Sequence, residues 1–153
     1  LILILIQLYT LCLISLIFIP FVQNDSQKIN YLFLIICICI TSDIGGYIVG
    51  NIFKGKKLTK ISPKKTYSGM IGSYLLSLIV NSLVFSNKMD FMNMFVITLT
   101  ISSLSQLGDL SISLMKRKAK IKDTGKLLPG HGGFLDRFDG LFLALPVSMI
   151  FFN

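Results

Sequence analysis

Residues 113–139, SLMKRKAKIKDTGKLLPGHGGFLDRFD, decide how this chain is organised. The stretch carries seven of the fifteen Lys and Arg residues, three of the seven Asp residues and the only His, and it lies between long apolar runs. Charged side chains gathered between apolar segments are typical of a loop where membrane spans meet water. We therefore expect the chemistry of the protein to lie in or beside this stretch.

The apolar segment that leads into this stretch carries a polar stripe. Polar residues recur there at steps of three or four, which places them on one face of a helix. They are Ser102, Ser105, Asp109, Ser113 and Lys116. A carboxylate inside a bilayer is costly unless it faces a bundle interior or a polar cavity. Asp109 is therefore a candidate site residue, and a structural ion pair is the alternative.

The second half of the stretch is suited to holding a ligand. Pro129 and three glycines surround His131, and such a backbone can approach a phosphate closely. Asp136 and Asp139 follow, one helical turn apart. Because neighbouring carboxylates repel each other, a hard divalent cation between them, or between them and Asp109, is the simplest explanation.

This stretch resembles, position by position, the signature of the phosphatidate cytidylyltransferase family, also called CDP-diacylglycerol synthases. The residues that carry the resemblance are Ser113, Lys116, Arg117, Lys122, Asp123, Leu128, Pro129, His131, Gly132, Gly133, Asp136, Arg137 and Asp139. Two earlier blocks are also similar to the family, at residues 43–50 (DIGGYIVG) and 61–69 (ISPKKTYSG). One position departs from the pattern, because the family usually has Glu where this chain has Ser68.

The resemblance implies an enzyme that transfers a cytidylyl group from CTP to phosphatidate and releases pyrophosphate. It implies that Asp109 and Asp136 hold magnesium and that Asp139 is a third ligand or orients one, with a second cation such as potassium as an option. Lys116 and His131 complete the expected catalytic set; His131 is expected to bind phosphate or hold the loop rather than act as a base. The expected substrate-binding residues are Lys64, Lys65, Ser113, Arg117, Lys122, Asp123, Lys126, Gly132, Gly133 and Arg137.

Composition indicates a membrane protein. The chain has 53% hydrophobic residues, a mean hydropathy of +0.75 and no Glu or Trp, which is not the balance of a soluble domain. We predict one all-α, polytopic membrane domain, residues 1–153, with a polar cavity that faces the cytoplasm. Its five spans are expected at about residues 1–22, 31–53, 68–85, 91–115 and 141–152. Because the chain opens with Leu inside an apolar run, we expect it to be the C-terminal portion of a longer protein.

The basic residues predict the orientation of the chain. Thirteen of the fifteen lie in two loops, residues 54–67 and 116–140, and by the positive-inside rule both loops face the cytoplasm. We therefore expect an integral protein of the inner membrane with its site on the cytoplasmic side. This placement argues against nucleic acid as the reason for the net charge of +8. The expected partners are CTP, phosphatidate and membrane lipid, and a homodimer is left open.

Two other segments carry regular patterns. Asp43 lies on a polar stripe in the predicted second span, where it either shares a cavity with Asp109 or has a hydrogen-bonded structural role. Gly46 and Gly50 form a small-xxx-small pair in that span, which predicts close helix packing. In the third span, Gly69, Ser73, Ser77 and Asn81 recur at steps of four, and this pattern predicts a packing surface.

Two alternative functions remain. A CTP-dependent polyprenol or dolichol kinase resembles this family in its membrane core, but it would release CDP instead of pyrophosphate. A membrane protein that only binds anionic lipid through its basic loops would not depend on magnesium, and it would leave Asp109, Asp136 and Asp139 without a role.

Overall fold

The computed structural model describes residues 26–59, 62, 65–85, 90–121 and 139–152. These residues form four helices, α2 (Ser26–Phe53), α3 (Tyr67–Phe85), α4 (Phe91–Lys118) and α5 (Leu141–Phe152). The only strand-like pairing within the described ranges is an isolated bridge between Lys57 and Thr66. The all-α prediction is confirmed for this part of the chain, while the predicted span at residues 1–22 lies outside the described residues.

Three of these helices are long and apolar enough to cross a membrane. They are α2 from Asn30, α3 and α4, and large apolar side chains such as Ile48, Leu75 and Val96 are exposed on their outer faces. Helix α5 has only 12 residues and contains Pro146, so it is too short for a hydrocarbon core of about 30 Å. The residues predicted as a fifth span form a helix with the predicted bounds, Leu141–Phe152, and this helix is not among the three candidate spans found in the described residues.

Small residues bring α2 and α3 into close contact. A Cβ atom added at Gly72 would overlap with Cβ of Val49 and would lie 2.8 Å from the carbonyl oxygen of Gly45. A Cβ atom at Gly69 would lie 2.7 Å from the carbonyl oxygen of Gly46. The predicted small-residue packing is confirmed on both helices, and the whole predicted stripe on α3 is buried.

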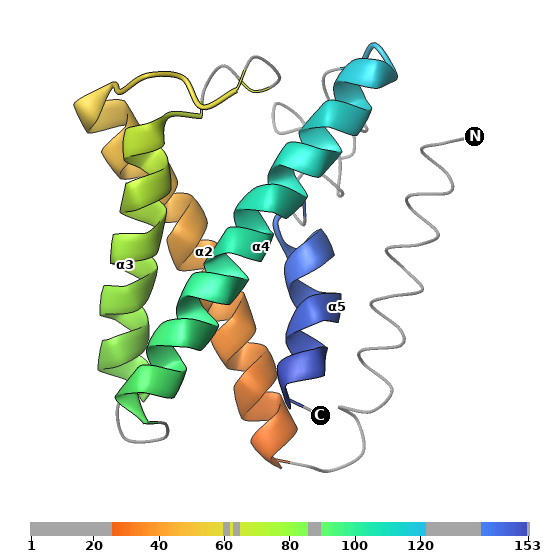
Figure 1. Cartoon of the computed structure of the whole chain (residues 1–153). Helices are drawn as coiled ribbons and strands as arrows, with labels where there is room; N and C mark the ends of the chain where they lie inside the picture. The colour runs from red at the N-terminus through yellow and green to blue at the C-terminus, as the bar shows by residue number, and fades with distance from the viewer. Residues whose placement is uncertain (1–25, 60–61, 63–64, 86–89, 122–138, 153) are drawn as a thin grey trace, which may run out of the picture.

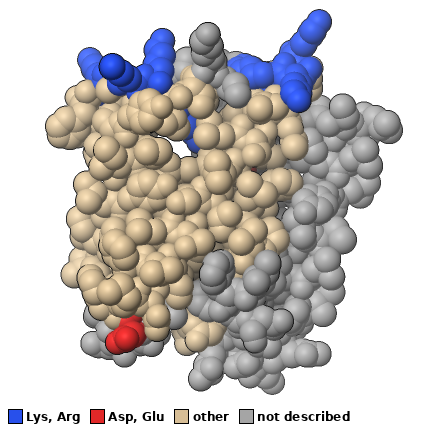
Figure 2. Space-filling model, in the orientation of Figure 1, with Lys and Arg blue, Asp and Glu red and all other residues tan. Residues whose placement is uncertain are grey.

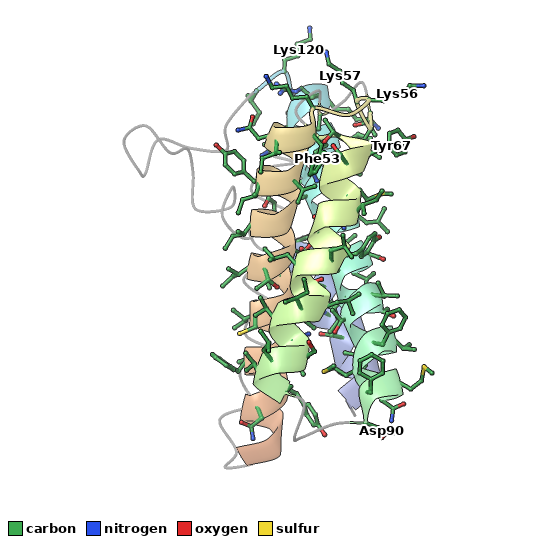
Figure 3. The ribbon with its side chains drawn as sticks, turned by 90° about the vertical axis from the view of Figure 1, so that its left-hand side faces the viewer. Phe53, Lys56, Lys57, Tyr67, Asp90 and Lys120 are labelled. Carbon is green, nitrogen blue, oxygen red and sulfur yellow. The ribbon has the colours of Figure 1, made fainter. Side chains whose placement is uncertain are left out.

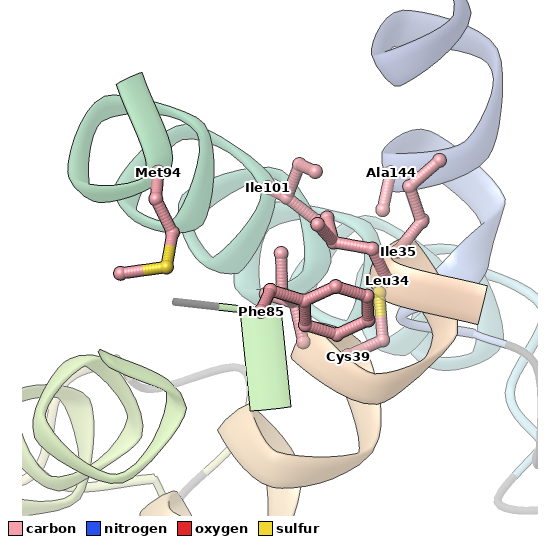
Figure 4. Close-up of a cluster of buried hydrophobic side chains, with 8 residues drawn as sticks. Leu34, Ile35, Cys39, Phe85, Met94, Ile101 and Ala144 are labelled. Carbon is pink, nitrogen blue, oxygen red and sulfur yellow. The ribbon is translucent and has the colours of Figure 1, made fainter. Parts of the chain in front are cut away.

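The apolar core lies where α2, α4 and α5 meet one end of α3 (Figure 4). Its buried side chains are Leu34, Ile35, Ile38 and Cys39 of α2, Phe85 of α3, Met94 and Ile101 of α4, and Ala144 of α5. Two buried hydrogen bonds between helices add specificity to this packing. Ser102 donates to Ser42 over 3.0 Å, and Asn81 donates to Thr98 over 2.9 Å.

Charge is unevenly distributed between the two ends of the bundle. Lys and Arg side chains gather at one end and an acidic side chain lies at the other (Figure 2). Figure 3 identifies Lys56, Lys57 and Lys120 at the first end and Asp90 at the second. Helix α4 ends at the basic end, where the three cations of its last turn complement the helix dipole.

Helix α5 begins beside the middle of α4 and runs along only half of that helix (Figure 1). A Cβ atom at Gly108 would lie 2.8 Å from the carbonyl oxygen of Asp139 and 3.1 Å from that of Gly140. Because Gly108 has no side chain, the backbone of Asp139 and Gly140 can lie directly against α4. This contact brings Asp139 next to Asp109 and fixes where α5 begins.

Candidate functional site

A cavity of about 290 Å³ lies between α2, α3, α4 and the loop that joins α2 to α3. Figure 2 shows a hollow just below the basic end, with a basic side chain inside it. The lining residues are Asp43, Gly46, Tyr47, Leu58, Ser62, Lys65, Thr66, Gly69, Met70, Ser73, Gln106 and Asp109. Most ligand sites combine such an apolar wall with a few charged groups.

Asp109 accepts contacts through both oxygens of its carboxylate. Its Oδ2 atom lies 2.5 Å from Nζ of Lys65, and its Oδ1 atom accepts a weak hydrogen bond from Ser113 over 3.4 Å. Lys65 also points at the carbonyl oxygen of Gln106, at 3.5 Å. The predicted site residues Lys65, Asp109 and Ser113 thus form one connected group, although they come from two separate segments.

Asp139 lies on the other side of Asp109. Its Oδ1 atom accepts a hydrogen bond from the backbone N–H of Gly140 over 3.0 Å, and its Oδ2 atom lies 4.0 Å from Nζ of Lys116. Burial is the main cause that raises the pKa of Asp139 to about 7. The negative charge of Asp109 and a hydrogen bond with that residue raise the pKa further, and Asp43 adds a smaller increase. The positive charge of Lys116 lowers the pKa and so opposes these effects. Asp109 and Asp139 can both be ionised only when a cation near them offsets the repulsion between their negative charges.

Asp43 belongs to the same group of carboxylates. It lines the cavity with Asp109, and its Oδ2 atom would lie 3.7 Å from a Cβ atom placed at Gly140. The structure therefore supports the shared-cavity interpretation of Asp43, a residue that the predicted site did not include. The signal was its position on a polar stripe in an otherwise apolar span.

The loop between α2 and α3 fixes the position of Lys65. The N–H of Leu58 donates to the carbonyl oxygen of Lys65 over 2.8 Å, and the N–H of Tyr67 donates to that of Lys56 over 3.0 Å. These bonds hold the two arms of the loop together. The side chain of Lys65 is then directed across the cavity to α4.

Ser68, which stands where the resembled family usually has Glu, helps to attach this loop to α3. Its Oγ atom accepts a hydrogen bond from the N–H of Gly55 over 3.3 Å and lies 3.0 Å from Oγ1 of Thr66. Thr66 in turn accepts from the N–H of Gly69 over 3.1 Å, as a helix N-cap residue does. Ser68 therefore has a structural role at the start of α3.

Not every predicted site residue is brought to the cavity. Ser113, Lys116 and Asp139 lie beside Asp109 without lining the cavity, and Arg117 is exposed in the last turn of α4 and does not line it. The other predicted residues lie outside the described part of the chain: Lys64, Lys122, Asp123, Lys126, His131, Gly132, Gly133, Asp136 and Arg137. Their roles stay predictions.

The described carboxylates fit magnesium in their chemistry, although they do not make a complete site. Carboxylate oxygens are the ligands that hard divalent cations prefer, and Asp109 and Asp139 each have a lysine ammonium as counter-charge. Within the described ranges, no three His, Cys, Asp or Glu residues lie close enough to hold one ion. The buried Nε2 atom of Gln106 has no hydrogen-bond partner among these residues, so the cavity wall retains an unused donor.

Comparisons with known proteins identify the family of the chain. The whole chain, residues 1–153, matches the model of the cytidylyltransferase family. A Rickettsia bellii protein named phosphatidate cytidylyltransferase is 40% identical over 161 residues, which cover 92% of this chain and 68% of the relative. A Rickettsia prowazekii protein of the same name is 41% identical over 155 residues, covering 88% and 67% of the two chains. A Bacillus subtilis protein of that name is 37% identical over 133 residues, 84% of this chain and 49% of the relative.

Proposed function

Because this chain belongs to the cytidylyltransferase family, we propose that it carries out the phosphatidate cytidylyltransferase reaction, which joins CTP and phosphatidate into CDP-diacylglycerol and releases pyrophosphate. The chain spans about two thirds of its Rickettsia relatives and about half of the Bacillus relative. The observation that carries the proposal is the meeting of Asp109 and Asp139 with Lys65 and Lys116 beside a cavity at the basic end.

The proposed reaction is a displacement at phosphorus. An oxygen of the phosphatidate phosphate attacks the α-phosphorus of CTP, a new phosphorus–oxygen bond forms, and the bond to the pyrophosphate leaving group breaks. The attacking phosphate is already ionised at neutral pH, so the site needs no strong general base. Positioning and neutralisation of charge are then the main tasks of the protein.

The described residues divide these tasks between them. Asp109 and Asp139, with Asp136, would hold magnesium, which supplies charge neutralisation and orientation to the phosphates when bound; a second cation such as potassium belongs to the same proposal. Lys65 and Lys116 provide ammonium groups on two sides of the carboxylates, where they can bind the triphosphate and the departing pyrophosphate.

The proposed orientation puts the basic end at the cytoplasmic face of the inner membrane. Support comes from the gathering of Lys and Arg at the end where the cavity lies, with Asp90 at the opposite end (Figures 2 and 3). The five-span arrangement, a cavity open to the cytoplasm and association of two copies are parts of the same proposal.

Product analysis tests the proposed reaction directly. We expect the full-length protein, given CTP, phosphatidate and magnesium, to form pyrophosphate and CDP-diacylglycerol in equal amounts, because the α-phosphorus is the proposed site of attack. Labelled CTP separated by chromatography reports both products. Omission of phosphatidate should stop pyrophosphate release. Formation of CDP and a newly phosphorylated lipid alcohol would instead identify a lipid kinase.

Stability of the metal-free protein should depend on pH through Asp139. Its pKa is raised to about 7 in the folded protein, so ionisation of this group opposes folding once the pH exceeds its ordinary value. The stabilisation is therefore fully present in acid and is lost as the pH rises through about 7. We expect a lower melting temperature at about pH 8 than at about pH 5 in the presence of a chelator.

Among the described residues, the charged groups that face Asp139 are Asp43 of α2 and Asp109 and Lys116 of α4. Asp139→Asn removes the titrating group and should flatten this part of the pH profile. Magnesium should restore the melting temperature at the higher pH. A wild-type profile identical to that of Asp139→Asn would contradict the prediction.

A further inference from the structure

Lys65 and Asp109 have been assigned to different partners, yet they bind each other. Lys65 was expected to contact substrate phosphate and Asp109 to hold magnesium, but the structure pairs the two side chains directly. We propose that the ammonium of Lys65 occupies the place of the cation at Asp109 and is released toward the triphosphate when the metal binds. This inference rests on the proposed function and adds an order of events to it.

The contacts of Asp109 favour such an exchange. Its Oδ2 atom is taken by Lys65 and its Oδ1 atom by Ser113, at 2.5 Å and 3.4 Å. A divalent cation binds carboxylate oxygen at about 2 Å, and an ammonium on the same oxygen would repel it at close range. The serine hydroxyl is neutral and contributes no such repulsion. Lys65 is therefore the group that we expect to leave.

The structure also allows Lys65 to leave without disturbing the fold. Its backbone is held by the hydrogen bonds between the two arms of the loop, so the long side chain can rotate while the loop stays in place. The side chain is 24% exposed and lines the cavity. Its second contact, to the carbonyl oxygen of Gln106, is long at 3.5 Å and is easily given up.

The released ammonium would then lie in the cavity, where phosphate oxygens can replace the lost carboxylate contact. Metal binding would in this way prepare the cavity for the triphosphate. By thermodynamic linkage, the triphosphate would strengthen metal binding by the same factor. Couplings of this kind usually correspond to roughly 5- to 150-fold changes in affinity.

Manganese binding in the absence of nucleotide tests the exchange. Wild-type protein and Lys65→Met are titrated with manganese chloride in detergent, and free manganese is followed by electron paramagnetic resonance. Because the competing ammonium is gone, we expect Lys65→Met to bind manganese about tenfold more tightly. The matched control is Lys57→Met, which removes an exposed lysine from the same loop and should leave the affinity unchanged.

Equal or weaker manganese binding by Lys65→Met would overturn the proposal, because a residue that contacts only phosphate cannot influence the metal without nucleotide. The wild-type protein gives a second measurement that does not depend on a variant folding. Manganese should raise the rate at which an amine-directed reagent modifies Lys65, measured by peptide mass spectrometry, several-fold above the change at Lys57. An unchanged rate at Lys65 would also overturn it.

The two proposals can fail separately. Release of pyrophosphate by the wild-type protein reports the proposed function, and metal affinity without nucleotide reports the exchange. If the wild-type protein makes CDP-diacylglycerol but Lys65→Met binds manganese as the wild type does, the proposed function stands and this inference is wrong. Tighter manganese binding by Lys65→Met, together with no pyrophosphate release by the wild-type protein, would retain this inference and lose the proposed function.

Discussion

Asp109→Asn is expected to reduce the rate of CDP-diacylglycerol formation by a factor on the order of a hundred to a thousand. Asparagine preserves the shape of the side chain and one oxygen, but it removes the negative charge that binds Lys65 in the structure and the cation in the proposed reaction. Both the metal and the substrate phosphates would then be held less well. Pyrophosphate release from CTP and phosphatidate at saturating magnesium measures the loss.

Asp90→Asn is the matched control for this experiment. Asp90 lies just before α4, at the opposite end of the bundle from the cavity (Figure 3), so its substitution should leave turnover unchanged. Asp136→Asn should behave like Asp109→Asn if both residues hold the same ion. Turnover near the wild-type value in Asp109→Asn or Asp136→Asn would refute the metal assignment.

Gly72→Ala is expected to have the largest effect on stability. The added methyl group would overlap with Val49 and lie 2.8 Å from the carbonyl oxygen of Gly45, so α2 and α3 would have to separate. Over-packing of this kind typically costs about 1–3 kcal/mol. Separation of these helices would also widen the cavity that they line. Unfolding by denaturant in detergent measures the loss of stability.

Leu75→Ala serves as the comparison on the same helix. Leu75 is 56% exposed on the outer face of α3, and substitutions at such surface positions usually change stability by no more than about 0.5 kcal/mol. If Gly72→Ala unfolds at the same denaturant concentration as wild type, α2 and α3 do not pack as closely as the structure indicates.

Periodicity was enough to predict most of the helices and the packing between two of them. The step of three or four along residues 102–116 identified one face of α4, and the step of four along residues 69–81 identified the buried face of α3. Both patterns follow from the helix repeat alone. They could therefore be found without knowledge of the partner helices.

The identity of the groups that meet in the site could not be predicted in the same way. Helical periodicity gives the face on which Asp43, Lys65 or Asp109 lies, but it does not say which faces turn toward each other. The pairing of Lys65 with Asp109 joins residues 44 positions apart and depends on the loop geometry around Leu58. Asp43 was for this reason recognised as a neighbour but left out of the predicted site.

The docking of α5 against α4 was the part of its arrangement that the sequence could not predict. An apolar run at residues 141–152 predicts a helix, and a helix is found there. What the run cannot show is that Gly108 accepts the backbone of Asp139 and Gly140 halfway along α4. The hydrophobicity of residues 141–152 does not depend on whether a glycine of another helix lets their backbone approach closely.

The position of α5 bears on the permeability of the membrane. Ala144 is fully buried against the apolar residues of α2 and α4 that follow the carboxylates toward the far end of the bundle. We therefore expect charged groups to enter from the lysine-rich side, where the cavity lies, and to be stopped by the packed core beyond it. A protein that performs the proposed reaction would in this way bind ionised substrates at the membrane without opening a path for ions across it.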